Sequence, residues 1–138
     1  MAEPPAARGL IDTSVVIGYE RVSFRRLPEK MAISSLTLAE LSAGPVATED
    51  DLERARRQER LQRFESGVDS LPFTAGCARA YGHVYAADVM SGRKPRGTRA
   101  VDLMIAATAL AHQLSLYTLN AKDLRGLEEL IEIVDVSA

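Results

Sequence analysis

The sequence contains few of the residues that form disulfides, bind zinc or cross a membrane. Cys77 is the single cysteine and only two histidines accompany it, so an internal disulfide is excluded and no zinc ligand set can be recognised. No apolar run reaches the ~18 residues that a membrane-spanning helix needs, and residues 1–8 lack the basic start and apolar centre of a signal peptide. These absences favour a protein of the reducing cytoplasm that has no membrane partner.

Positively charged residues are also fewer than acidic ones. Lys and Arg number 17 against 19 Asp and Glu, which gives a net charge of −2. The molecule as a whole therefore does not attract nucleic acid, and such binding requires a local group of cations. A predicted loop over residues 92–99, GRKPRGTR, supplies one, which consists of Arg93, Lys94, Arg96 and Arg99. A solvated surface loop is the alternative interpretation of the same residues.

The length and the apolar pattern predict one α/β domain. The 138 residues suit a single core, and residues 1–7, with two prolines and three alanines, read as a loose extension of a domain over residues 8–138. Short apolar runs predict strands over residues 8–11, 32–33, 68–73, 114–119 and 131–136. Helices are expected to start after Asp12, at Ser34 or Ser35, at Thr48, at Thr74 and at Thr98. This alternation predicts a mostly parallel sheet of four to five strands with helices on both faces.

The most informative stretch is 97–120, GTRAVDLMIAATALAHQLSLYTLN. Residues 100–111 are almost all apolar, which predicts a helix that is covered on most sides. Asp102 and Thr108 interrupt this run. A carboxylate removed from water must be neutral, hydrogen-bonded, paired or metal-bound, because its transfer alone costs several kcal/mol. Asp102 is therefore either a site residue or an acid that complements the helix dipole.

Three further acids stand where a site is expected. Asp12 follows the first predicted strand, Asp123 begins the turn after the fourth, and Glu40 lies on an otherwise apolar helix face, although a partly exposed surface glutamate is the alternative. Ligands of parallel α/β sheets collect at the carboxyl ends of strands. By contrast, His83 and Asp88 have no local partner and are assigned to the surface.

A convergent group of these acids needs a counter-charge. Two carboxylates ~5 Å apart repel by ~3 kcal/mol at an effective dielectric of 20, so the group must bind protons or a cation. An all-oxygen set without His or Cys suits Mg²⁺ or Mn²⁺ rather than zinc.

Four segments carry a resemblance to a known family. They are GLIDTSVVI around Asp12, ISSLTLAEL around Glu40, RAVDLMIAATAL around Asp102, and LYTLNAKDL around Asn120 and Asp123. In content, order and spacing they resemble the PIN-domain ribonucleases, and among these the short toxins of VapBC toxin–antitoxin pairs. The resemblance covers nearly the whole chain and implies a PIN-like nuclease domain.

The resemblance implies a Mg²⁺-dependent endoribonuclease, with Mn²⁺ able to substitute, that a co-encoded antitoxin inhibits and that forms a homodimer. Asp12, Glu40, Asp102 and Asp123 are then the catalytic acids. Asp12 and Asp102 are the primary metal ligands, and Glu40 binds the metal through water or orients the attacking water. Such cleavage leaves a 5′-phosphate and a 3′-hydroxyl, and the cations of loop 92–99 position the RNA backbone.

One departure concerns the fourth acid. Some relatives have an acid immediately after the strand-end threonine, whereas this chain has Thr118-Leu119-Asn120, so the fourth site residue is either Asn120 or Asp123. Residues expected to hydrogen-bond around the ligands are Thr13, Ser14, Thr118 and Asn120. Two other functions compete with the toxin: a housekeeping PIN nuclease of RNA maturation, and a non-catalytic α/β module that binds protein or RNA. A phosphoacceptor receiver domain fits poorly, because it needs paired acids after the first strand.

Overall fold

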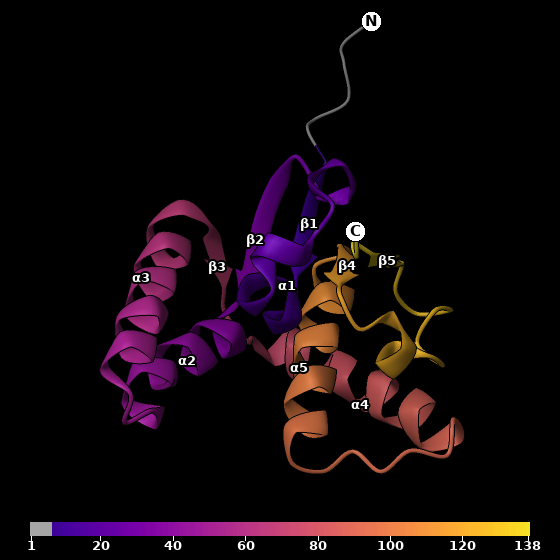
Figure 1. The fold of residues 1–138 in the computed structure, drawn as a ribbon. Coiled ribbons are helices and arrows are strands. Elements are labelled where there is room, and N and C mark those ends of the chain that lie inside the picture. Colours follow the sequence, from indigo (N-terminus) through magenta and orange to yellow (C-terminus); the bar gives the residue numbers. More distant parts are fainter. Residues whose placement is uncertain (1–6) are drawn as a thin grey trace, which may run out of the picture.

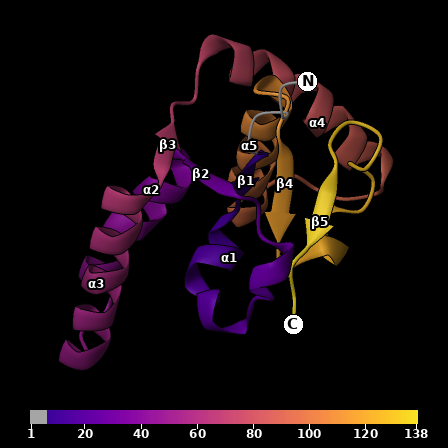
Figure 2. The ribbon, with the colours of Figure 1, turned by 90° about the horizontal axis from the view of Figure 1, so that it is seen from above.

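The computed structural model describes residues 7–138 and contains a five-stranded sheet in which all neighbouring strands are parallel. Figure 2 shows the arrows of the two strands β4 and β5 pointing the same way. The strand order is β3-β2-β1-β4-β5, with β1 (Arg8–Ile11), β2 (Lys30–Ser34), β3 (Asp69–Leu71), β4 (Ser115–Thr118) and β5 (Ile133–Asp135). The predicted α/β class and parallel sheet are confirmed. The predicted loose extension over 1–7 lies, apart from Ala7, outside the described residues.

The helices that connect the strands begin close to the predicted positions. They are α1 (Thr13–Ile17), α2 (Ser35–Ala43), α3 (Asp51–Gly67), α4 (Ala75–Met90) and α5 (Thr98–Ala111). Short 3₁₀ turns are η1 (Tyr19–Arg21), η2 (Phe24–Arg26), η3 (Gly44–Ala47) and η4 (Ala121–Leu124). The side chains of Asp12, Ser34 and Thr74 accept hydrogen bonds from the first turns of α1, α2 and α4. Across residues 7–138, none of these helices has the length and apolar content of a membrane span.

Two predicted helix caps are wrong. The N-cap of α3 is Asp50, and the Thr48 hydroxyl instead accepts a hydrogen bond from the Asp50 amide at 3.2 Å, just before the helix. Thr98 lies inside α5, whose N-cap is Gly97 with a φ of 59°. This left-handed conformation favours glycine, and it lets the chain turn sharply from the preceding loop into the helix.

Alternate residues of the central strands face two hydrophobic cores. Leu10 of β1 lies beside Ala32 and Leu116 and packs on the side of α4 and α5. Ile11 and Ile33 belong to the second core, with residues of α1, α2 and α3. Each fully buried Leu or Ile side chain stabilises the fold by about 1.5–3 kcal/mol. The central strand is therefore fixed from both faces, and so is the chain that directly follows it.

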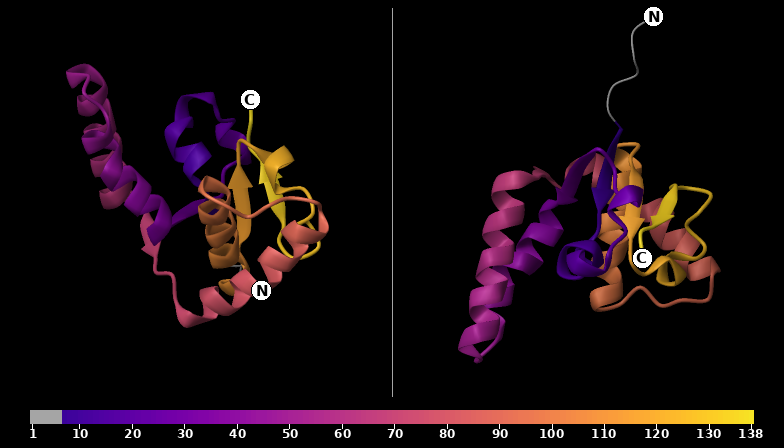
Figure 3. Two further views of the ribbon diagram at one scale, coloured as in Figure 1. Left: turned by 90° about the horizontal axis from the view of Figure 1, so that it is seen from below. Right: turned by 45° about the horizontal axis from the view of Figure 1, so that its top comes forward.

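Helices α2 and α3 form an arm at the β3 edge of the sheet. The two helices pack against each other and project away from the strands (Figures 1 and 3). Phe64 near the end of α3 is buried in the second core, whereas Leu52 near its start is 61% exposed. Helix α3 is therefore peripheral, and its apolar side chains pack into the core at one end only.

Candidate active site

Asp12 is held rigidly at the carboxyl end of β1. Its amide donates to the Tyr117 carbonyl of β4 at 3.0 Å, and its carboxylate accepts from the Ser14 hydroxyl at 2.5 Å and the Val15 amide at 3.3 Å. Burial raises the pKa of Asp12, and hydrogen bonds from Ser14 and Thr118 partly oppose this effect. Asp12 is therefore a mostly buried carboxylate with one fixed orientation.

Glu40 reaches the same region from α2. Its Oε1 accepts a hydrogen bond from the Thr13 hydroxyl at 2.7 Å, and that hydroxyl also lies 3.0 Å from the hydroxyl of Thr37, which is fully buried. Glu40 is exposed, and so are its neighbours Ala39 and Ala43. The alternative interpretation of Glu40, a surface glutamate, therefore describes its exposure, and the alanines on its helix face are open to solvent as well. What directs this carboxylate toward α1 is the bond from Thr13.

Asp102 also lies at an open edge instead of inside the core. The buried residues of α5 are Leu103 and 105–109, and Asp102 itself is exposed, so the predicted covering of this position is wrong. Its carboxyl group nevertheless lines a hollow shared with Asp12. Partial burial, followed by the charges of Asp12 and Glu40, raises the pKa of Asp102 to about 6; Arg99 lowers it and Asp123 raises it. Asp12, Glu40 and Asp123 are therefore close enough to Asp102 to repel its negative charge.

Asp12, Asp102 and Asp123 line a small hollow of about 40 Å³ at the carboxyl ends of β1 and β4. This volume accommodates a water molecule or a metal ion and is far too small for a nucleotide. A polymeric substrate would therefore lie across its mouth. The lining consists of Asp12, Thr13, Ser14, Asp102, Ile105, Leu116, Thr118, Asn120, Asp123 and Leu124. Glu40 stands just outside this lining and borders it through Thr13.

Both candidates for the fourth position line this hollow. Asn120 follows β4, and its backbone amide donates a hydrogen bond to the Thr118 hydroxyl at 2.9 Å. Asp123 lies one turn later in η4, where its amide donates to the Asn120 carbonyl at 3.0 Å. Asp123 is the charged member of the two, and its negative charge raises the pKa of Asp102. The Asn120 side chain is a neutral amide. The predicted hydrogen bonders Thr13, Ser14 and Thr118 all line the hollow as well.

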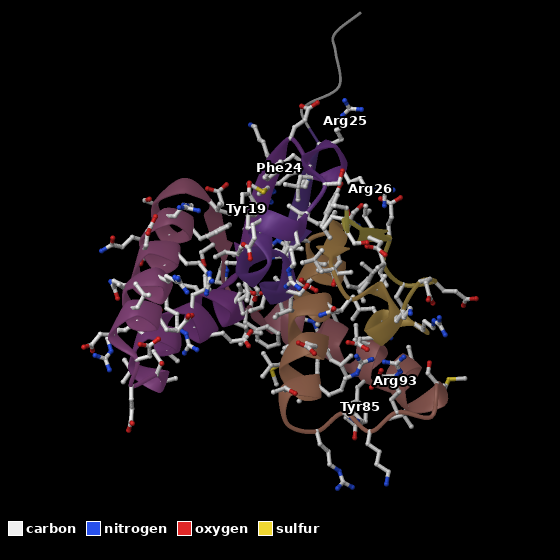
Figure 4. All side chains as sticks on the ribbon, in the orientation of Figure 1. Tyr19, Phe24, Arg25, Arg26, Tyr85 and Arg93 are labelled. Atoms are coloured by element: carbon white, nitrogen blue, oxygen red, sulfur yellow. The ribbon has the colours of Figure 1, made fainter. Side chains whose placement is uncertain are left out.

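The cationic loop between α4 and α5 uses part of its positive charge in contacts within the protein. Arg93 donates to the carbonyls of Asp123 at 2.6 Å and Lys122 at 2.8 Å, so it ties the loop to the turn that carries an acid of the site. Figure 4 shows Arg93 beneath that C-terminal segment. Lys94 and Arg96 are exposed. The loop therefore presents Lys94 and Arg96 outward and uses Arg93 to hold the site together.

Arg99 forms an ion pair with Asp88, and the assignment of Asp88 to the surface is wrong. The Asp88 side chain is 0% exposed, and both of its oxygens accept from the Arg99 guanidinium, whose side chain is 15% exposed. The pair joins the end of α4 to the first turn of α5. No local pattern signals this pair, because the two residues are eleven positions apart on separate helices. His83 is exposed, as predicted.

The donor set consists of oxygen atoms and suits a hard divalent cation. No three His, Cys, Asp or Glu side chains in residues 7–138 are placed closely enough to hold a metal ion on their own. Mg²⁺ commonly uses one or two carboxylates and keeps several waters. The residues thus fit a partly hydrated ion better than an ion enclosed by protein ligands.

Comparison with known proteins identifies the family. Residues 10–130 match the PIN domain. The chain belongs to the PIN-domain family. Ribonuclease VapC1 of Rickettsia felis is 32% identical over 133 residues, which cover 94% of this chain and 96% of that protein. The resemblance to PIN domains of the VapC kind, inferred from four sequence segments, is confirmed.

Solved structures of PIN-domain proteins agree with this assignment. One is a member of the VapBC family of toxin–antitoxin systems, VapBC-5 of Mycobacterium tuberculosis, with a TM-score of 0.83, 31% identity and coverage of 94% of this chain and 99% of the other. Another is VapBC2 of Rickettsia felis, described as bound to a DNA fragment from its promoter, with a TM-score of 0.68, 26% identity, and 93% and 99% coverage. The PIN-like fold is therefore shown for nearly the whole chain.

Proposed function

We propose that this PIN-domain protein is a Mg²⁺-dependent endoribonuclease of the VapC kind, the toxin of a toxin–antitoxin pair in the prokaryotic cytoplasm. The observation that carries the proposal is the group of three acids, Asp12, Asp102 and Asp123, that line a water-sized hollow at the strand ends, with Glu40 just outside it. The electrostatic repulsion among such carboxylates is lowered when a cation binds between them. The printed names of the relatives, ribonuclease VapC, support RNA as the substrate.

Asp12 and Asp102 are the residues that would hold the metal ion directly, with Glu40 reaching it through water and further waters completing its coordination. When bound, Mg²⁺ supplies positive charge against the substrate phosphate and acidifies water, while Mn²⁺ can substitute for it. Asp12 is fixed by Ser14 and by the Val15 amide, so its orientation needs no adjustment on binding. This preorganisation lowers the entropy cost of assembling the site.

Glu40 is the residue placed to orient the attacking water. The Thr13 hydroxyl holds its Oε1 from one side, which leaves the other oxygen of the exposed carboxylate to accept a proton from water. Attack by water on the phosphorus atom breaks the bond to the 3′-oxygen, which leaves with a proton as a 3′-hydroxyl, and the phosphate stays on the 5′ side of the next nucleotide. Asp123 or Asn120 completes the rim of the site.

The antitoxin has a place to bind next to the acids. An open groove of about 310 Å³ lies between α1, α2 and α3 and is lined by Thr13, Ile17, Glu40, Leu41, Gly44, Glu53, Arg57 and Arg60. One solved relative is described as a member of the VapBC family of toxin–antitoxin systems, which supports a protein segment as the occupant. Such a segment would cover Ile17 and could insert a cation against Glu40 in competition with the metal. A homodimer is proposed on the family resemblance.

Cleavage of RNA by the purified, antitoxin-free protein tests this function. We expect cleavage with Mg²⁺ or Mn²⁺, none in EDTA, and products with 5′-phosphate ends. Glu40→Gln is expected to lower kcat by roughly a hundredfold, within the 10²–10⁴ range of general acid–base catalysis. Full activity in EDTA, with no residual metal by elemental analysis, would refute the metal mechanism.

A second measurement separates the toxin from a housekeeping nuclease. Co-expression with the neighbouring small gene is expected to yield a complex in which cleavage is inhibited, and to relieve growth arrest. Unimpaired growth on expression of the protein alone, together with maturation of a defined precursor RNA, would favour the housekeeping function.

A further inference from the structure

A second and larger hollow opens beside the acid site. Its volume is about 490 Å³, and it shares Ser14 and Asn120 with the water-sized hollow between the acids. The other lining residues are Ile17, Arg21, Leu119, Ser137 and Ala138. Ligand pockets of about 300–1,000 Å³ hold small organic molecules, so this hollow is large enough for a nucleotide unit, which the acid site is not.

Arg21 is the charged side chain of this lining. It is exposed, and no Asp or Glu side chain from residues 7–138 borders the hollow. Its Nη2 lies over Gly18, 2.6 Å from where a Cβ of that residue would be, and the Leu119 Cδ1 is equally close. The missing side chain of Gly18 thus makes room for a guanidinium and an apolar side chain to lie together. In loop 92–99, by contrast, Arg93 and Arg99 are bound within the protein, which leaves Lys94 and Arg96 as its outward cations.

The chemistry of the hollow matches one unit of a single-stranded nucleic acid. An arginine fork binds phosphate oxygens with two parallel hydrogen bonds. Ile17 and Leu119 give apolar walls for a base or sugar, and the Asn120 amide offers both a donor and an acceptor. Unstacked bases of single-stranded RNA are recognised through such edge and face contacts. The shared Ser14 also ties the hollow to the site, since its hydroxyl contacts Asp12 at 2.5 Å and accepts from the Leu119 amide at 3.0 Å.

We propose that this hollow binds the nucleotide next to the cleaved phosphate of a single-stranded RNA, with Arg21 on a neighbouring phosphate and Ile17 and Leu119 against the base or sugar. The inference rests on the proposed ribonuclease function and assigns its substrate subsite. Arg21 contributes equally to the bound substrate and to the transition state, so it acts on KM and leaves kcat nearly unchanged.

The test measures binding of a short, fluorescein-labelled single-stranded RNA of mixed sequence by anisotropy, in EDTA and in an Asp102→Asn background so that the RNA stays intact. Arg21→Gln is compared with Arg25→Gln, which removes the same charge from an exposed residue of η2 (labelled in Figure 4) that does not line the hollow. Arg21→Gln is expected to weaken binding about tenfold and to lower the salt slope by about one. Arg25→Gln is expected to change the Kd by less than about twofold.

The outcomes are distinguishable. Equal Kd values and equal salt slopes for Arg21→Gln and Arg25→Gln, with the parent protein binding RNA and the Mg²⁺-loaded wild type cleaving it, would overturn the subsite and leave the ribonuclease intact. In the active background, the proposal predicts that Arg21→Gln raises KM at nearly constant kcat, and a fall in kcat alone would contradict it. A wild type that neither binds nor cleaves RNA would end the proposed function and this inference with it.

Discussion

Replacing Asp102 by asparagine should stabilise the metal-free protein at neutral pH. The pKa of Asp102 is raised from its usual value near 3.8 to about 6. A shift of about 2 units corresponds to about 3 kcal/mol between the two protonation states. Because Asp102 is exposed, solvent screening weakens the repulsion, and a gain of about 1 kcal/mol is expected for Asp102→Asn at pH 8 in EDTA.

The sign of the pH dependence follows from linkage. Between pH 4 and 6 the folded protein holds a proton on Asp102 that the unfolded chain has lost, so wild-type stability falls as the pH rises through this window. Above about pH 6 Asp102 is ionised in both the folded and the unfolded protein, so its repulsion in the folded state lowers the stability by the full amount. Below about pH 4 both are neutral, and the advantage of Asp102→Asn should vanish.

Urea unfolding in EDTA at pH 8 and at pH 4 measures this difference. The control is Asp69→Asn, an exposed acid of β3 outside the site, which should change stability by less than about 0.5 kcal/mol. If Asp102 instead served the helix dipole, asparagine would cost up to ~1 kcal/mol at pH 8. A destabilised Asp102→Asn protein at pH 8 would therefore refute the repelling cluster.

Three further predictions concern residues that position the site. Thr13→Val removes the hydroxyl that holds Glu40, so kcat should fall about tenfold with little change in KM, and an unchanged kcat in a steady-state cleavage assay would count against this role. Arg99→Met leaves the buried Asp88 carboxylate without its cation and should cost about 3–5 kcal/mol in urea unfolding, with partial recovery on adding Asp88→Asn; a loss below about 1 kcal/mol would contradict a buried pair. Arg93→Ala frees the η4 turn, so cleavage should fall severalfold while RNA affinity stays near wild type, and a loss of affinity alone would show that Arg93 contacts RNA.

The parallel sheet and the place of Asp12 could be predicted because they depend on local patterns. Short apolar runs alternating with capped helices define the strands, and a parallel sheet brings their carboxyl ends to one edge. Ser34 and Thr74 were recognisable as helix caps from residue type alone. Such features involve neighbours in sequence, so the sequence carries them directly.

The exposure of Asp102 could not be predicted in the same way, and for Glu40 the sequence left a buried and an exposed position open. Apolar neighbours indicate a covered face only if another element lies over it, and no helix covers Ala39 or Ala43. The burial of Asp88 depends on Arg99 from the next helix, which no local pattern reveals. The hydrogen bonds of Arg93 likewise go to carbonyl groups about thirty residues away in the sequence. Contacts between distant elements decided each of these cases.

Calorimetric titration with Mn²⁺ tests most directly whether the acid cluster binds a divalent cation. At pH 6, where Asp102 is half protonated, binding to the wild type should release about half a proton, and at pH 8 almost none, as measured in buffers of different ionisation enthalpy. Asp102→Asn should lose most of the affinity and the proton release, while Asp69→Asn should retain both. Equal Mn²⁺ affinity in wild type and Asp102→Asn, or proton release that does not depend on pH, would contradict a metal site built on these acids.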